Sequence, residues 1–107
     1  MNSIQEDVKR LITERGWEKY HRPRYLVDAL SVEVAELMNE CLWHTPDQVD
    51  KLFLEHNEAI VKELADIAIN FFSLIHFSGV DIEKEVHEKV EELLSRYGNL
   101  NPGEHRK

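Results

Sequence analysis

Carboxylates at helical spacing mark an otherwise apolar stretch, residues 63–77. Its polar side chains follow one another at steps of three and four residues, so they share one stripe of a helix. They are Glu63, Asp66, Asn70 and Ser73. Because the helix is apolar almost all round, we expect it to be buried. An unpaired buried carboxylate costs several kcal/mol and residues 64–77 contain no Lys or Arg, so the stripe needs a positive partner from elsewhere.

A second acidic pair, Glu33 and Glu36, lies three residues apart on another helical pattern, residues 26–43. If the two helices face each other, four carboxylates meet. Each like-charge pair at about 4–5 Å then costs roughly 3–4 kcal/mol at an effective dielectric constant of about 20. Protonation with raised pKa values is one solution, but a divalent cation is the more economical one, and an all-oxygen site suits Mg²⁺ or Mn²⁺. We therefore predict a metal site on these two helices.

Bulk properties narrow the class of protein. A chain of 107 residues allows one domain with a real core. The net charge of −8 argues against a protein that coats a nucleic acid polymer, although a bound metal ion still permits a nucleotide substrate. The single cysteine, Cys41, fits a reducing compartment. The longest apolar run, residues 71–77, is too short for a membrane span, and the polar N-terminus is not a signal peptide, so we expect no membrane partner and a cytoplasmic location.

Start and stop signals predict four main helices and one short helix. Gly16 ends the first helix, and Pro23 fits the first turn of the second. A capping box at residues 45–48 opens the short helix. Gly79 closes the long apolar helix, and Asp81 caps the last one. With no strand alternation, this pattern predicts an all-α helical bundle: one domain over residues 1–98, followed by a flexible tail over residues 99–107.

These motifs resemble those of the MazG-like all-α nucleoside triphosphate pyrophosphohydrolases. Glu33-Val-Ala-Glu36 followed by Glu63-Leu-Ala-Asp66 is similar to the family signature Glu-x-x-Glu … Glu-x-x-Asp. The flanking residues 17–26, residues 29–37 and Trp43 look like those of the dCTP pyrophosphatase branch. The resemblance covers about residues 17–97 and implies a MazG-like four-helix bundle with the short extra helix between the two acidic helices.

The resemblance also implies a reaction and a set of roles. Family members cleave between the α- and β-phosphates of a nucleoside triphosphate and release a nucleoside monophosphate and pyrophosphate. It implies that Mg²⁺, with Mn²⁺ as a possible substitute, is held by four carboxylates, namely Glu33, Glu36, Glu63 and Asp66. Either Glu33 or Glu36 would serve as the general base for the attacking water.

Further residues are implied as substrate contacts. The base pocket would be lined by Trp17, His21 and Trp43. The leaving pyrophosphate would be held by Lys89 and Arg96, with Arg24 and Lys62 behind them. Asn70 would either orient the carboxylates or bond across the helix interface. Three positions depart from the family pattern, namely Asn70, Leu93 and Gly98, and they leave base choice and pyrophosphate handling open.

The leading hypothesis is therefore a Mg²⁺-dependent nucleotide pyrophosphohydrolase that acts on a dCTP-like or non-standard nucleoside triphosphate. The alternative is a non-catalytic helical module that binds nucleotide or a partner protein, its acidic stripes forming an ordinary solvated face. A phosphoribosyl-ATP pyrophosphohydrolase would share the fold. A di-iron bundle needs two Glu-x-x-His pairs, whereas only Glu18 and His21 have that spacing. Since four helices hardly close a pocket, we expect a homodimer or larger assembly, with apolar residues such as Phe71 and Phe77 at the interface.

Overall fold

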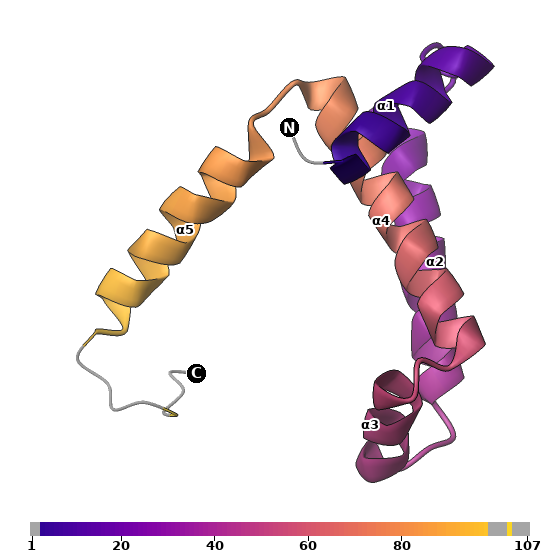
Figure 1. The fold of residues 1–107 in the computed structure, drawn as a ribbon, viewed down its shortest axis with the longest axis vertical. Helices are drawn as coiled ribbons and strands as arrows, with labels where there is room; N and C mark the ends of the chain where they lie inside the picture. The colour runs from indigo at the N-terminus through magenta and orange to yellow at the C-terminus, as the bar shows by residue number, and fades with distance from the viewer. Residues whose placement is uncertain (1–2, 99–102, 104–107) are drawn as a thin grey trace.

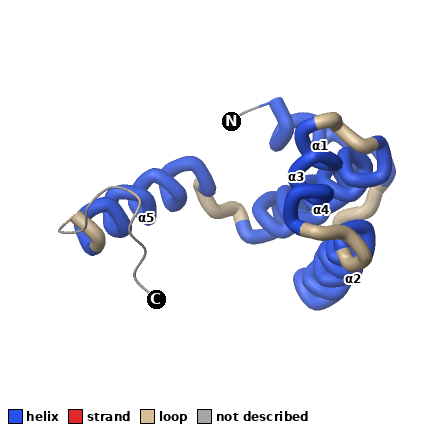
Figure 2. The backbone as a smooth tube through the Cα atoms, turned by 90° about the horizontal axis from the view of Figure 1, so that it is seen from below, coloured by secondary structure: helices blue, strands red, loops and turns tan. Residues whose placement is uncertain are grey.

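Five α-helices form the computed structural model, which describes residues 3–98 and residue 103 (Figure 1). They are α1 (Ser3–Arg15), α2 (Pro23–Cys41), α3 (Pro46–Leu54), α4 (Glu58–Ser78) and α5 (Ile82–Arg96). No strand occurs among these residues, as Figure 2 shows, so the predicted all-α class is confirmed, as is the short helix between the two acidic ones. The predicted tail, residues 99–107, falls outside the described part of the chain except for residue 103.

The helices begin and end where local chemistry directs them. The capping box at α3 is present, because Thr45 Oγ1 accepts a hydrogen bond from the Gln48 amide at 3.2 Å and Gln48 Oε1 accepts one from the Thr45 amide at 2.9 Å. Pro23 occupies the first turn of α2, where its missing N–H has no consequence. Asp81 caps α5 through the Lys84 amide. The signals read from the sequence are confirmed at these three helix starts.

Helices α2 and α4 form an antiparallel pair that extends along most of their length, and α1 packs against α4 (Figure 1). Short α3 connects the pair at one end. The buried apolar side chains of the described residues come from the three packed helices and are Val8, Ile12, Leu26 and Ile60. A core this small stabilises the pairing of α2 with α4 but leaves much apolar surface open. None of the described helices is long and apolar enough to cross a membrane.

The apolar character of residues 63–77 predicts a helix that is buried on all sides. This prediction is wrong for a single chain. Within α4 only Ile60 and Ser73 are buried, whereas Leu64 is 43% exposed and Phe77 is 56% exposed. The physical reason is that α4 is covered by α1 and α2 and only marginally by α3, so part of its circumference meets no neighbour. The apolar pattern identified a helix made for burial, but one chain does not complete that burial.

Helix α5 extends away from the other helices in both views (Figures 1 and 2). The radius of gyration, 17.1 Å, is larger than the value of about 13 Å expected for a compact domain of about 100 residues. Two apolar residues of α5, Val86 and Leu94, are 53% and 64% exposed. The fourth main helix therefore does not close a four-helix bundle within one chain.

His56, between α3 and α4, has a φ of 54°, in the left-handed region that favours glycine. A side chain there costs about 1–2 kcal/mol, and glycine loses about 0.5–1 kcal/mol through greater freedom in the unfolded chain. We expect His56→Gly to raise the free energy of unfolding by about 0.5 kcal/mol, measured as a higher urea midpoint. His87→Gly, inside exposed α5, is the control and should lower it by about 0.3–0.5 kcal/mol. Equal losses in the two variants would contradict the strain at His56.

Candidate metal centre

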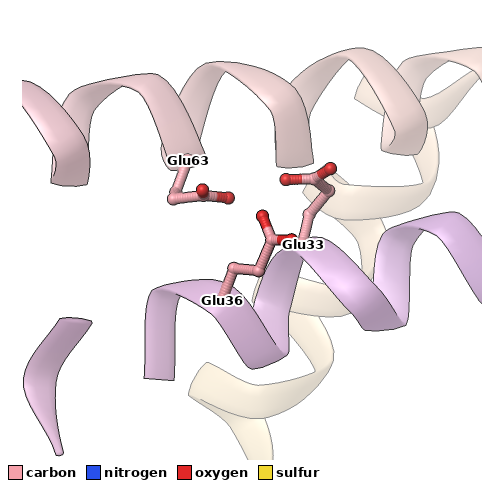
Figure 3. A group of neighbouring side chains, drawn as sticks. All are labelled: Glu33, Glu36 and Glu63. Atoms are coloured by element: carbon pink, nitrogen blue, oxygen red, sulfur yellow. The ribbon is translucent and has the colours of Figure 1, made fainter. Parts of the chain in front are cut away.

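Three glutamates face one another across the α2–α4 pair. Figure 3 shows Glu33 and Glu36 pointing from α2 toward Glu63 on α4. One carboxylate oxygen from each residue lies within 4.8 Å of the other two. Glu33 and Glu63 are half-buried, and Glu36 is exposed, so the cluster opens to solvent on one side. The spacing of three on α2 and the antiparallel pairing of the helices produce this arrangement.

Two oxygens of the cluster are buried but have no hydrogen-bond partner. Oε2 of Glu33 and Oε2 of Glu63 are buried and accept no hydrogen bond from the described residues. Such an oxygen is costly unless a donor or a cation satisfies it. Hard carboxylate oxygens converging from two helices, with one open side for water or phosphate, are the ligand set that Mg²⁺ and Mn²⁺ prefer. The residues present therefore fit a divalent cation.

The electrostatics of the cluster agree with this assignment. The pKa of Glu63 is raised from 4.5 to about 7, chiefly by the adjacent carboxyl group of Glu33, then by burial, then by the neighbouring Glu36. Three carboxylates this close do not all ionise without a compensating charge. Near neutral pH and without a cation, the cluster retains a proton on Glu63 for part of the time. A divalent cation removes the need for that proton.

Metal binding should consequently release a proton, and its affinity should depend on pH. Below pH 7 the cation must displace the proton on Glu63, so the apparent affinity for Mn²⁺ or Mg²⁺ should rise about tenfold per pH unit and level off above about pH 8. Calorimetric titration at pH 6 and pH 8, in buffers of different ionisation enthalpy, measures both the affinity and the protons released. Equal affinity and no proton release at pH 6 would contradict the assignment.

The stability of the metal-free protein should show the opposite trend. A carboxyl group with a raised pKa in the folded state contributes stability fully below its unfolded value of 4.5, and that contribution is lost as the pH rises through about 7. With saturating Mg²⁺, stability should instead increase with pH over this range, since deprotonated Glu63 is the form that binds the cation. Thermal melts at pH 6 and pH 8, with and without Mg²⁺, test whether the cation reverses the pH dependence of stability.

The remaining polar residues of the predicted stripe lie beyond the cluster. Asp66, one turn further along α4, is exposed and does not belong to the group of three, so its role as a ligand stays a prediction. Asn70 Nδ2 donates to the backbone oxygen of Asp66 at 3.1 Å, and Ser73 Oγ donates to the backbone oxygen of Ile69 at 2.8 Å. Both side chains thus bond within α4, and this hydrogen bond of Asn70 goes neither to the carboxylates nor across the helix interface.

The three predicted base-pocket aromatics occupy opposite ends of α2. Trp17 and His21 lie together before its start, with ring centroids 5.4 Å apart. Nδ1 of His21 is buried without a hydrogen-bond partner, and His21 lines a cavity of about 240 Å³ beside Ser73. Trp43 follows the end of α2 and is 86% exposed. About 30 Å of helix separates Pro23 from Trp43, so one chain does not bring these residues into one pocket.

None of the four predicted phosphate-binding cations contacts the cluster. Arg24 pairs with Asp28 at 3.3 Å, and Lys62 pairs with Glu58 at 3.2 Å. Lys89 and Arg96 both donate to a single carboxylate on α5, that of Glu92. Hydrogen bonds from Lys89 and then Arg96 lower the pKa of Glu92.

The sequence interpretation missed Glu92. Its position three residues after Lys89 and four before Arg96 was the available signal, because residues at these spacings share a helix face.

The carboxylate cluster on two paired helices of an all-α chain defines a class of protein, and the sequence comparison identifies it. Residues 29–105 match the MazG-like family, and the chain belongs to that family. Among curated relatives, it is 33% identical to dCTP pyrophosphatase 1 of Rattus norvegicus and 34% identical to dCTP pyrophosphatase 1 of Homo sapiens, in each case over 98 residues. Each alignment covers 86% of this chain and 58% of the relative, so the chain spans less than two thirds of these proteins.

A solved structure supports the same fold. The chain superimposes on the crystal structure of a pyrophosphatase from Archaeoglobus fulgidus with a TM-score of 0.76 and 27% sequence identity, covering 86% of both chains. The family and the MazG-like fold implied by the acidic motifs are therefore confirmed.

Proposed function

We propose that this protein is a Mg²⁺-dependent nucleotide pyrophosphohydrolase that converts a (deoxy)nucleoside triphosphate, dCTP or a similar one, to the nucleoside monophosphate and pyrophosphate. The observation that carries the proposal is the trio of Glu33, Glu36 and Glu63, whose converging oxygens include two buried atoms without a partner. The relatives named dCTP pyrophosphatase support the reaction class and favour a pyrimidine deoxynucleotide.

We assign the three glutamates different roles because their exposure to solvent differs. Glu33 and Glu63, half-buried and adjacent across the α2–α4 pair, are placed to hold a cation. Bound Mg²⁺ supplies charge neutralisation for the triphosphate and a lowered pKa for water. Glu36 is the exposed member and faces the open side, so we assign it the general-base role of accepting the proton of the attacking water. This assignment selects between the two carboxylates that the sequence left open.

A homodimer or larger assembly is part of the proposal. One chain buries few apolar side chains, and it places Trp43 at the opposite end of α2 from Trp17 and His21. If two chains pack side by side in opposite directions, the start of one α2 lies near the end of the other. Trp17 and His21 of one chain would then lie near Trp43 of its partner. Light scattering is expected to give at least twice the chain mass of 12.6 kDa. A value of 12.6 kDa at micromolar concentration would contradict the assembly.

A nucleotide panel tests the activity. Natural and modified nucleoside triphosphates are incubated with the protein and Mg²⁺, and the products are separated by ion-exchange chromatography. We expect equal amounts of monophosphate and pyrophosphate, with highest kcat/KM for a pyrimidine deoxynucleotide, and no activity when the divalent cation is chelated. Release of orthophosphate alone, or activity that survives chelation, would refute the proposal.

A non-catalytic nucleotide-binding module is the second candidate, and one observation favours it. Lys89 and Arg96 are both paired with Glu92 on α5, away from the carboxylate cluster of the same chain. Metal binding distinguishes the two functions before any assay of turnover. At a concentration of 100 Kd, a cation that binds only the folded state adds about 2.7 kcal/mol of stability. A module that has lost the metal site would show no Mg²⁺- or Mn²⁺-dependent rise in melting temperature.

A further inference from the structure

Three exposed cations gather in the turn that joins α1 to α2. This turn, residues 15–22, lies at the opposite end of α2 from α3 (Figure 1). Its cations are Arg15, Lys19 and Arg22, and none of them forms an ion pair within the part of the chain that the structure describes. We call residues 15–22 the basic turn.

Most other cations of the described residues are already neutralised. Seven Lys and Arg side chains pair with a carboxylate three or four residues away, and they are Arg10, Arg24, Lys51, Lys62, Lys84, Lys89 and Arg96. The basic turn differs because Gly16, with a φ of 64°, ends α1. The turn therefore lacks the helical spacing that brings opposite charges together elsewhere in the chain.

Backbone hydrogen bonds hold the basic turn in one conformation. The amide of Trp17 donates to the Ile12 carbonyl at 3.0 Å. The amides of Tyr20 and His21 both donate to the Trp17 carbonyl, at 2.8 and 2.9 Å. The backbone that carries the three cations is consequently fixed at the start of α2, and the cations do not depend on a loose linker for their position.

The rest of the molecule repels anions. Residues 23–98 contain sixteen acidic side chains and only six basic ones. A nucleoside triphosphate is strongly anionic, so most approaches to the carboxylate cluster meet charge of the same sign. From the basic turn, ten residues of α2 lead from Pro23 to Glu33, a distance of about 15 Å along the helix. The turn is thus a positive surface next to an acidic site.

Aromatic side chains accompany these cations. Tyr20, in the turn, and Tyr25, near the start of α2, are each 64% exposed. The ammonium group of Lys19 lies 5.1 Å from the centroid of the Tyr20 ring. Since nucleic acid bases stack on aromatic side chains, a surface that combines exposed rings with cations fits a ligand that carries both a planar base and phosphate. A nucleotide fits the turn better than a simple anion does.

We propose that the basic turn is the capture site for the anionic substrate, where Arg15, Lys19 and Arg22 attract the triphosphate and raise its concentration beside the metal centre. The inference rests on the proposed function, because it assumes that the carboxylate cluster acts on a nucleoside triphosphate. The three cations are positioning residues and not catalytic ones, since they lie outside the cluster. Charge at the rim of a site acts mainly on the association rate constant.

Charge reversal in the turn, Lys19→Glu combined with Arg22→Glu, tests the capture. Stopped-flow fluorescence of Trp17 and Trp43 measures association of a non-hydrolysable α,β-methylene nucleoside triphosphate with Mg²⁺. At about 0.01 M salt, where the Debye length is about 30 Å, the association rate constant should fall by about tenfold. The dissociation rate constant should change by less than about twofold.

Screening should remove this difference. At about 1 M salt the Debye length is only about 3 Å, so the reversed variant and the wild type should associate with the nucleotide at equal rates. An unchanged association rate constant at low salt, or a loss that persists at high salt, would overturn the inference.

The matched control is Lys51→Glu combined with Lys84→Glu. These two cations are exposed, lie on α3 and α5, and change the net charge by the same amount. The control should keep the association rate constant within about twofold of the wild type. A fall equal to that of the turn variant would show that net charge alone governs association, and it would overturn the capture site.

Steady-state kinetics separate capture from chemistry. At low salt the turn variant should raise KM about tenfold and leave kcat unchanged, whereas a lower kcat at unchanged KM would place the turn in the chemical step and overturn the inference. Hydrolysis by the wild type that the turn variant leaves unaltered would refute the capture alone. Nucleotide binding without hydrolysis in the wild type would refute the proposed function alone, because the stopped-flow comparison still tests the capture. A wild type that binds no nucleotide would refute both.

Discussion

Replacement of Glu63 by Gln should abolish metal-dependent pyrophosphate release while leaving the metal-free protein at least as stable as wild type. The carboxylate of Glu63 has a pKa raised to about 7 because it is close to Glu33 and Glu36. A neutral amide relieves that repulsion, and its N–H is a donor that the buried oxygen of Glu33 lacks. The same change removes a charged ligand, so we expect kcat/KM to fall by more than about 100-fold.

Two quantities are measured, the melting temperature without metal and its rise on addition of Mg²⁺. An ordinary destabilising substitution would lower both. The melting temperature without metal should hold or rise, whereas the rise produced by Mg²⁺ should disappear along with the activity. Glu58→Gln is the matched control, since Glu58 lies on the same helix, is exposed and does not belong to the cluster. It should keep both the activity and the Mg²⁺ effect. Loss of activity in both variants, or in neither, would show that the cluster is not the metal centre.

The cluster was predictable in part because part of its cause is local. Glu33 and Glu36 share a helix face by spacing alone, and Glu63 stands at the polar edge of an apolar helix that must pack on something. Capping signals likewise depend on a few adjacent residues, and they located the starts of α2, α3 and α5. The capping features follow from the chemistry of neighbouring residues, and the structure confirms them. Of the four carboxylates predicted to meet, the structure brings three together.

What escaped prediction depends on the arrangement of distant elements. The apolar pattern of α4 shows that the helix is built for burial, but it does not say which chain supplies the cover, so single-chain burial was wrong at Leu64 and Phe77. The direction of α5 is set by the turn at Gly79 and not by the pattern within the helix. For the same reason the motif residues Trp17 and Trp43, assigned to one pocket, lie at opposite ends of α2.

The second large effect concerns the small core that aligns the carboxylates. Ile60 is 1% exposed and lies one turn before Glu63 on α4, on the face that packs within the structure. Truncation of a buried Ile to Ala costs about 2–5 kcal/mol, out of the 5–15 kcal/mol that holds a typical domain together. Because few other side chains are buried, little else stabilises the pairing of α2 with α4. We therefore expect Ile60→Ala to lower the melting temperature by more than about 10 °C at a fixed protein concentration.

Ile60 should also affect the metal centre, because the register of α4 against α2 fixes the distances among the three glutamates. The apparent affinity for Mg²⁺ should therefore drop in Ile60→Ala at temperatures where the protein is still folded, and Ile60→Val should recover most of both properties. Leu54→Ala, on the 81% exposed side chain at the end of α3, should change stability by less than about 0.5 kcal/mol and leave metal affinity unchanged. If Ile60→Ala behaved like Leu54→Ala, contact between α2 and α4 at this point would not be what holds the carboxylates together, and the metal centre would need another source of rigidity.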